Sequence, residues 1–554
     1  MKHTFVLLAL LATAFSMLGC TSAPPATTQL PAATQPAVVT ISTQPTTAPA
    51  TEAAVPSKEG GTLLVAITSD PGHFNPSITT GFTTHVVADS MFNGLVGLDE
   101  NLQPIPDLAD EWQVSNDGKT YTFHLHPGIM WHDGTPFTSA DVKFSFENIL
   151  LKFHSRTAAG LTPVLDKIET PDANTVVFHF QVPYGPLLQR LDVTEAPILP
   201  QHIYQGTDPQ KADANLKPVG TGPFKFVEYA KGDHVTLEKN ATYFKKGMPR
   251  LDKVIFKVIP DANAALQALQ KGEVDYSWAT NESQMKTLQG SPGITTAKAA
   301  ASPGGSFCIN TFAFNLEHPP LDKVQVRQAI NHAIDRQRIQ NQIHFGFGKV
   351  ATGPISSRMS WFYNPNVTKY DFDVEKAKQL LDQAGVKPGA DGARLKLVFP
   401  HPTTFNKYGE LIREQLGAVG IQVQDAPMDF NAATDRVFVK RDFDLAIVSF
   451  CNGPDPEIGV RRVYDSRNIK PIPFSNGAAY KNPRIDELFD KGALTIGNEQ
   501  RAPSYLEIQD ILTKDLPYLW FIETEGTRAH RSEFHDFQNW TGHFAEYAWT
   551  DNPK

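Results

Sequence analysis

Cysteine, net positive charge and long apolar runs are all scarce in this chain of 554 residues. The three cysteines are too widely spaced for a metal-binding motif. The formal charge of −9 argues against nucleic acid as a partner, because phosphate binding needs a basic face. After the first twenty residues no segment is apolar for ~20 residues, so no membrane-spanning helix is predicted. The sequence also lacks G-x-S-x-G, H-E-x-x-H and P-loop patterns, so no enzyme signature and no cofactor is indicated.

The first residues have the pattern of an export signal. Lys2 precedes an apolar run from Phe5 to Leu18, which is too short for a comfortable membrane span. The run ends in Gly19-Cys20, which resembles the bacterial lipobox, although Met17 and Leu18 depart from its usual residues. That resemblance implies a signal peptide over 1–19 and lipidation of Cys20. The alternative is a simple secretory signal with a chance cysteine.

Residues 20–58 are predicted to form a disordered, lipid-anchored linker. Of the 38 residues from 21 to 58, 28 are Ser, Thr, Ala or Pro and none is aromatic. Such a segment cannot bury enough apolar surface to offset its ordering entropy. As a flexible coil it would span roughly 35 Å, which keeps a folded domain near the membrane but clear of it.

The rest of the chain alternates predicted strands and helices, which indicates an α/β fold with mixed sheets. Its length favours two or three lobes. A helix is expected over 86–98, and a long amphipathic helix over 322–341. A capping box of Thr138 and Asp141 is expected to open a further helix through 148. The principal strands are expected over 60–68, 119–125, 175–180, 222–229, 235–239, 253–259, 395–399, 421–424, 443–450 and 518–523.

Several motifs together resemble the family 5 extracellular solute-binding proteins of ABC importers, which include dipeptide-, oligopeptide- and nickel-binding proteins. The likeness covers about 60–530 in the order of the family. The motifs are LADEW (108–112), SNDGKTYTF (115–123), HDGTPFT (132–138), PVGTGPF (218–224), GEVD (272–275), VRQAI (326–330), AIDR (333–336), DFD (442–444) and NPRID (482–486). Most of these residues are expected to shape the scaffold rather than touch a ligand.

The resemblance implies a two-lobed periplasmic-binding-protein clamshell (type II, the large class with an extra subdomain). The first lobe is expected over 59–96, 219–305 and 518–554, the inserted subdomain over 97–218 and the second lobe over 306–517. The lobes are expected to close over a short peptide, and the loaded form to dock on an ABC permease and ATPase complex. The protein is expected to be a monomer outside the cytoplasmic membrane. Alternatives are a nickel-chelate or oligosaccharide carrier on the same fold and, more remotely, an envelope enzyme or sensor.

The resemblance places candidate ligand residues mainly in the loop after the Asp-Phe-Asp strand. There Asp455 is expected to pair with the α-ammonium of a peptide, because a buried cation needs a fixed carboxylate. The alternative is that Asp455 only caps the turn or helix that follows. Arg461 or its neighbour Arg462 could bind the peptide carboxylate, although both could lie on the surface, and Arg358 is a further option.

The loop after the first strand is the second candidate region, because family members bring it to the ligand, where backbone groups pair an extended peptide. His124, His126 and His132 could suggest a metal, but an exposed strand face explains them better, so no metal site is predicted. Cys308 and Cys451 could form a disulfide in an exported protein, but we expect free thiols. The remaining candidate ligand residues are Ser69, Gly72, His73, Phe74, Phe314, Phe450, Cys451 and Asn452.

Overall fold

The computed structural model describes residues 59–278, 281–299, 307–538 and 542–553. These residues belong to one compact unit, Ser57–Lys554. The predicted signal peptide (1–19), the linker (20–58) and the lipidation site Cys20 lie outside the described residues.

A seven-stranded mixed sheet forms the centre of the first lobe, with the strand order β12-β19-β11-β1-β10-β9-β8. The central strand β1 (Thr62–Ile67) pairs in parallel with β10 and β11, whereas the other neighbours are antiparallel. Alternate residues of a strand point to opposite faces, so Leu63 and Val65 enter one buried cluster while Ala66 packs in another, with α6. The other elements of this lobe are η1 (Pro76–Ile78), α1 (Phe82–Ala88), β8 (Phe224–Ala230), β9 (His234–Lys239), β10 (Lys253–Val258), α6 (Ala262–Lys271), β11 (Tyr276–Ser277), α7 (Glu282–Leu288), β12 (Ile294–Ala299), β19 (Gly526–Arg531), β20 (Phe534–His535) and β21 (Trp549–Thr550).

The chain between α1 and β8 builds the inserted subdomain around a four-stranded antiparallel sheet, β4-β5-β7-β6. Its core contains Trp131, Phe123 and Phe178, all nearly or fully buried. The predicted capping box is confirmed, since the Thr138 N–H donates to Oδ2 of Asp141 over 2.9 Å. The elements are β2 (Val96–Leu98), β3 (Pro104–Pro106), β4 (Ala109–Val114), β5 (Thr120–Leu125), α2 (Ser139–Phe144), the π-helical η2 (Ser145–Leu150), α3 (Leu151–Phe153), α4 (Ser155–Leu161), β6 (Leu165–Asp172), β7 (Thr175–Phe180), η3 (Leu188–Arg190), α5 (Gln201–Tyr204) and η4 (Asp213–Asn215).

The second lobe contains a four-stranded sheet, β14-β18-β13-β17, and a separate parallel pair, β15-β16. Two large apolar clusters form its core, one of them around Phe312 and Phe521. The elements are β13 (Phe307–Phe314), α8 (Val324–Ala333), α9 (Arg336–Ile343), β14 (Lys349–Val350), α10 (Val374–Gln383), β15 (Leu395–Pro402), η5 (Thr403–Phe405), α11 (Asn406–Gly417), β16 (Ile421–Met428), α12 (Phe430–Thr434), the π-helical η6 (Asp435–Lys440), β17 (Leu445–Asn452), α13 (Val460–Tyr464), η7 (Ser466–Asn468), α14 (Pro483–Leu494), α15 (Asn498–Asp515) and β18 (Tyr518–Glu523).

Two helix predictions were wrong in their extent. The helix expected over 322–341 is divided into α8 and α9, because Ile334 is extended and the Asp335 side chain caps α9 by accepting from the Arg338 N–H. The helix expected over 86–98 ends at Ala88, and Val96–Leu98 is a strand. Apolar runs without a clear period allow either structure, and tertiary packing decides between them.

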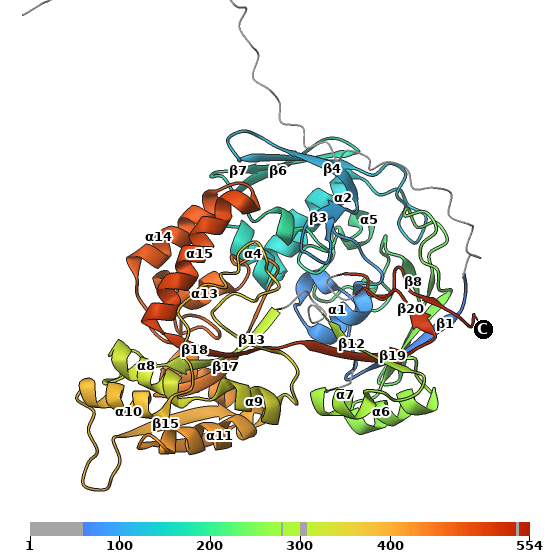
Figure 1. The fold of residues 1–554 in the computed structure, drawn as a ribbon. Coiled ribbons are helices and arrows are strands. Elements are labelled where there is room, and N and C mark those ends of the chain that lie inside the picture. Colours follow the sequence, from blue (N-terminus) through green and yellow to red (C-terminus); the bar gives the residue numbers. More distant parts are fainter. Residues whose placement is uncertain (1–58, 279–280, 300–306, 539–541, 554) are drawn as a thin grey trace, which may run out of the picture. The chain divides into compact units, whose positions relative to one another are not determined.

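One predicted boundary between the lobes, at residue 518, differs in the structure. Strand β18, which the sequence analysis assigned to the first lobe, pairs with β13 and β14 in the sheet of the second lobe. The chain therefore returns to the seven-stranded sheet only at β19, and Thr524 and Glu525 join the two sheets (Figure 1). The short connection explains the error, because β18 and β19 read as neighbouring strands in the sequence.

Candidate ligand-binding site

The loop that follows β17 is folded tightly over residues 453–459. The Gly453 N–H donates to the Ile458 carbonyl over 2.6 Å, which closes the loop on itself. Gly459 has φ +123°, and a Cβ there would lie 2.4 Å from Oδ1 of Asn452. Glycine is therefore required where the loop turns into α13. The segment after the Asp-Phe-Asp strand is a loop, as expected, while its role in ligand binding stays a prediction.

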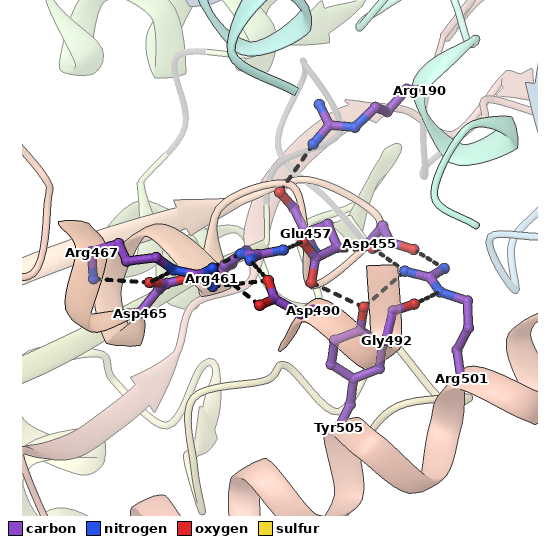
Figure 2. A network of polar contacts seen from close by, with 10 residues as sticks. All are labelled: Arg190, Asp455, Glu457, Arg461, Asp465, Arg467, Asp490, Gly492, Arg501 and Tyr505. Carbon is purple, nitrogen blue, oxygen red and sulfur yellow. Dashed lines mark hydrogen bonds and ion pairs between the residues drawn. The ribbon is translucent and has the colours of Figure 1, made fainter. Parts of the chain in front are cut away.

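Asp455 is fully buried and is paired within the chain (Figure 2). Its Oδ2 and Oδ1 accept from Nη1 and Nη2 of Arg501 over 2.5 and 2.8 Å, and Arg501 is equally buried on α15. The Glu457 N–H also donates to Oδ1 over 2.9 Å. A buried carboxylate needs such a partner, and here Arg501 supplies it. In this structure Asp455 therefore organises the loop, close to the alternative stated above, and its oxygens are not free for a peptide ammonium.

Arg461 is neutralised in the same way by acidic neighbours. Its guanidinium pairs with Glu457 and Asp465, over 3.0 Å in each case, and also contacts Asp490 (Figure 2). Arg467 extends this network by pairing with the same Asp465 and Asp490. Three carboxylates around one guanidinium leave it little affinity for another, so the predicted role of Arg461 as a carboxylate receptor does not fit the structure.

Arg462 differs from its neighbour Arg461. Within the described residues it has no salt bridge; its Nη2 donates to the Cys451 carbonyl over 3.4 Å, and its guanidinium lies 5.9 Å from the ring centre of Phe474. In the described part of the chain, the buried Nε of Arg462 has no hydrogen-bond partner. Burial, and then the charge of Arg156, lower the pKa of Arg462 to about 10. The side chain is therefore a half-buried cation without a counter-ion.

The inserted subdomain contributes two arginines to the same region. Arg156, on α4, pairs with buried Glu195 over 2.9 Å. Arg190 donates to the carbonyls of Arg156 and Glu457 over 3.2 and 3.0 Å, which ties the subdomain to the 453–459 loop (Figure 2). The buried Nε atoms of Arg156 and Arg190 have no hydrogen-bond partner among the residues that the structure describes. Side chains of the inserted subdomain thus meet the 453–459 loop and α13 at one junction, which contains Arg156, Arg190 and Arg462.

Acidic and histidine side chains lie close to Arg156 and Arg190. Nδ1 of His85 lies 3.0 Å from Oδ1 of Asp89. Burial lowers the pKa of His85, but the charge and hydrogen bond of Asp89 and the bond to the Thr79 carbonyl raise it above its usual value. Burial raises the pKa of Asp192 to about 7, and the charges of Glu195 and Asp89 add to the effect. The pKa of His154 is held well below its usual value by burial and by the nearby cations. The junction is thus a dense set of titratable groups.

The loop after β1 is partly buried in the first lobe. Phe74 is fully buried against Phe226 and Tyr229, so it belongs to the core. Ser69 is exposed, and its hydroxyl lies 2.7 Å from that of Thr83. Gly72 is also exposed, whereas His73 is half-buried, with a pKa lowered by burial. Ser69, Gly72 and His73 remain predictions as ligand contacts, and Phe74 does not fit that role.

The other candidate ligand residues lie in the apolar core, in a disulfide or at the surface. Phe314 and Phe450, two of the candidate ligand residues, are buried in the apolar clusters of the second lobe, so a role as ligand contacts does not fit. Cys451 forms a disulfide with Cys308, directly opposite on β13, so the expected free thiols were wrong. Asn452 is buried, and among the described residues its Oδ1 has no hydrogen-bond partner. Arg358 is exposed and stays a prediction as a ligand contact.

Sequence reasoning missed Arg156, Arg190 and Arg501. No local pattern distinguishes them from surface arginines, because the acids that pair with Arg156 and Arg501 and the carbonyls that Arg190 binds are at least 30 residues away in the chain. A separate cavity of about 260 Å³ in the second lobe was also not foreseen. There Arg336 donates to the carbonyls of Ala351 and Tyr370, which satisfies it within the lobe.

Comparison with known proteins decides the family. The family model described as bacterial extracellular solute-binding proteins, family 5 Middle, matches residues 103–471. The chain belongs to this family. The dipeptide-binding protein of Escherichia coli is 30% identical over 66% of this chain and 72% of its own length. The glutathione-binding protein GsiB of Pectobacterium atrosepticum is 28% identical over 83% and 88%.

The fold of the family is found in solved structures as well. The periplasmic binding protein DppA of Helicobacter pylori, in complex with the peptide STSA, superimposes with a TM-score of 0.72 at 25% identity and covers 90% of this chain and 99% of its own. The predicted α/β, two-lobed binding-protein fold with mixed sheets is confirmed by this likeness and by the family model. The family consists of extracellular binding proteins rather than enzymes.

Among the described residues, none of the helices has both the length and the apolar character that crossing a membrane requires. Across the same ranges, no group of three or more His, Cys, Asp or Glu side chains is placed to hold a metal ion.

Proposed function

We propose that this protein is the substrate-binding component of an ABC importer and that it captures short peptides. The observation that carries the proposal is the agreement of nearly the whole described chain with peptide-binding relatives. One of these relatives is a solved structure in complex with the peptide STSA, which covers 90% of this chain. Another is named a dipeptide-binding protein. Binding by lobe closure and delivery to a permease and ATPase complex follow from the family, because ligand favours the closed state.

The ligand-contacting residues are proposed from the structure rather than from the sequence motifs. The junction that brings Arg156, Arg190 and Arg462 together has uncompensated buried donors of the kind that a zwitterionic ligand needs. Ser69, Gly72 and His73 remain candidates for backbone pairing with a peptide. Asp455 and Arg461 are assigned to the support of the loop instead.

Calorimetry and native mass spectrometry with pools of di-, tri- and tetrapeptides test the proposal. Micromolar or tighter binding of at least one pool is expected. A protein that ignores every pool but binds a nickel–histidine complex or an oligosaccharide would refute peptide capture while leaving the family intact. Incubated peptides should be recovered uncleaved, since the function requires binding without turnover.

We further propose that the protein is lipid-anchored through Cys20 and held near the membrane by residues 21–58. The proposal rests on the lipobox-like Gly19-Cys20 and on the linker composition. Mass spectrometry of the mature N-terminus should find a diacylated cysteine. The variant Cys20→Ser should be released into the soluble fraction, whereas an unchanged membrane association would contradict the anchor.

A further inference from the structure

The β2–β3 hairpin of the inserted subdomain carries a buried leucine at its tip. Leu102 is 5% exposed, whereas the preceding Glu100 and Asn101 are exposed. The Leu102 side chain belongs to an apolar cluster whose other buried members, from Phe307 to Trp520, all lie in the second lobe. The hairpin therefore reaches out of the subdomain and inserts Leu102 into the core of the second lobe.

The backbone of the hairpin tip is held in a conformation that is unusual for leucine. Leu102 has φ +62°, in the left-handed region that a bulky side chain rarely adopts. The Leu102 N–H donates to the Asp99 carbonyl over 3.0 Å. Oδ1 of the same aspartate accepts from the N–H groups of Asn101 and Gln103, over 2.8 Å in each case. Such an outlier persists where other contacts compensate for it, and here the burial of the side chain in the second lobe does so.

The second lobe returns an apolar side chain to the subdomain. Ile496, in the connection between α14 and α15, is half-buried and packs against the apolar core of the inserted subdomain. The contact is close, because a Cβ at Gly118 would lie 2.5 Å from Cγ1 of Ile496. The two parts thus exchange side chains, with Leu102 inserted in one direction and Ile496 in the other.

Two hydrogen bonds accompany this exchange. The Gly185 N–H donates to the Ala493 carbonyl over 2.9 Å, and Nη2 of Arg190 donates to the Glu457 carbonyl over 3.0 Å (Figure 2). The strands of the subdomain and of the second lobe belong to separate sheets, and the chain passes from one part to the other through the first lobe. The interface between them is therefore held by packing and hydrogen bonds rather than by strand pairing, and it can separate when the lobes open.

We propose that the inserted subdomain is the clasp of the closed clamshell, with Leu102 as the residue that latches it. The inference rests on the proposed function, because it assumes that a bound peptide closes the lobes. A contact that forms in the closed state adds to the apparent affinity for every ligand that needs this state. Leu102 then slows ligand release without touching the ligand, since its apolar contact must break before the lobes open.

The test removes the latch and measures closure separately from folding. Leu102→Ala deletes most of the side chain, and Leu102→Met keeps its volume. Leu216→Ala is the matched control, because Leu216 lies in the same subdomain and is 46% exposed. Ile496→Ala weakens the interface from the opposite side. Calorimetry with pools of di-, tri- and tetrapeptides gives the affinity, stopped-flow fluorescence the release rate, small-angle scattering the degree of closure, and thermal melting the stability of the ligand-free protein.

We expect Leu102→Ala to weaken peptide binding about 10- to 100-fold, mainly through faster release, and Ile496→Ala to weaken it in the same direction. Leu102→Met and Leu216→Ala should bind as wild type does. Peptide-bound Leu102→Ala should have a larger radius of gyration than peptide-bound wild type. The melting temperatures of the ligand-free proteins should agree, because the open protein does not use the contact.

Three outcomes contradict these expectations in different ways. Wild-type affinity in both Leu102→Ala and Ile496→Ala overturns the clasp but leaves peptide capture standing. A lower ligand-free melting temperature of Leu102→Ala with unchanged affinity also overturns it, since Leu102 would then be a permanent core residue. A wild-type protein that binds none of the peptides overturns the proposed function, and this inference with it.

Discussion

Replacing Asp455 by asparagine separates a structural role from a ligand-binding role for this residue. In the structure the Asp455 carboxylate holds Nη1 and Nη2 of Arg501, and the remaining Nε of Arg501 donates to the Gly492 carbonyl over 2.9 Å. Neither Asp455 nor Arg501 has any exposed side-chain area. Asp455→Asn keeps the shape but leaves a buried guanidinium without its counter-charge.

The expected loss is about 3–5 kcal/mol, the usual cost of removing one partner from a buried ion pair. For a cooperative unit of roughly 200 residues, about 1 kcal/mol shifts the melting temperature by about 2 °C. The second lobe of the ligand-free protein should therefore melt about 6 to 10 °C lower, as scanning calorimetry would measure. The double variant Asp455→Leu with Arg501→Met should recover part of this loss, because it removes both buried charges.

The control is the exposed ion pair between Arg484 on α14 and Glu507 on α15, the helix that also carries Arg501. Glu507→Gln should change stability by less than about 1 kcal/mol, because exposed pairs contribute little. The reasoning would be refuted by an Asp455→Asn protein that melts within 1 °C of wild type but loses peptide affinity 100-fold or more. That result would assign Asp455 to the ligand ammonium, as the sequence first suggested.

Three further perturbations follow from the same structure. Loss of the Cys308–Cys451 disulfide, which spans 143 residues, should lower the free energy of unfolding by at most about 5 kcal/mol, measured as a drop in melting temperature for the double serine variant. Gly459→Ala should destabilise by about 1–3 kcal/mol more than Gly72→Ala, because only the former forces a Cβ onto Asn452; urea titration compares the two. The pKa of Asp192 is raised to about 7 from 3.8, so the folded protein holds this proton more tightly than the unfolded chain. Stability should then fall as pH rises between those values, and Asp192→Asn should flatten that slope in urea titrations at pH 4.5 and 7.5.

Much of the fold could be predicted from local pattern. The central strand β1, the antiparallel strands β5 and β7, and the capping box at Thr138 all follow from period and turn chemistry. The predictions that were wrong concerned features that depend on contacts between residues far apart in the chain. The sheet to which β18 belongs is decided by its pairing with β13, more than 200 residues earlier, and no property of Tyr518–Glu523 itself indicates it.

The binding residues were harder to predict for a related reason, which Arg461 and Arg462 illustrate. The two are adjacent, chemically identical and equally plausible in the sequence as receptors for a carboxylate. On α13 they point in different directions, so Arg461 meets Glu457, Asp465 and Asp490 while Arg462 meets a ring and one carbonyl. The acids that neutralise Arg461 come from three separate segments. Whether a charged side chain is available to a ligand therefore depends on which charges are already paired with one another in the fold. A sequence motif shows the residue types but not this pairing.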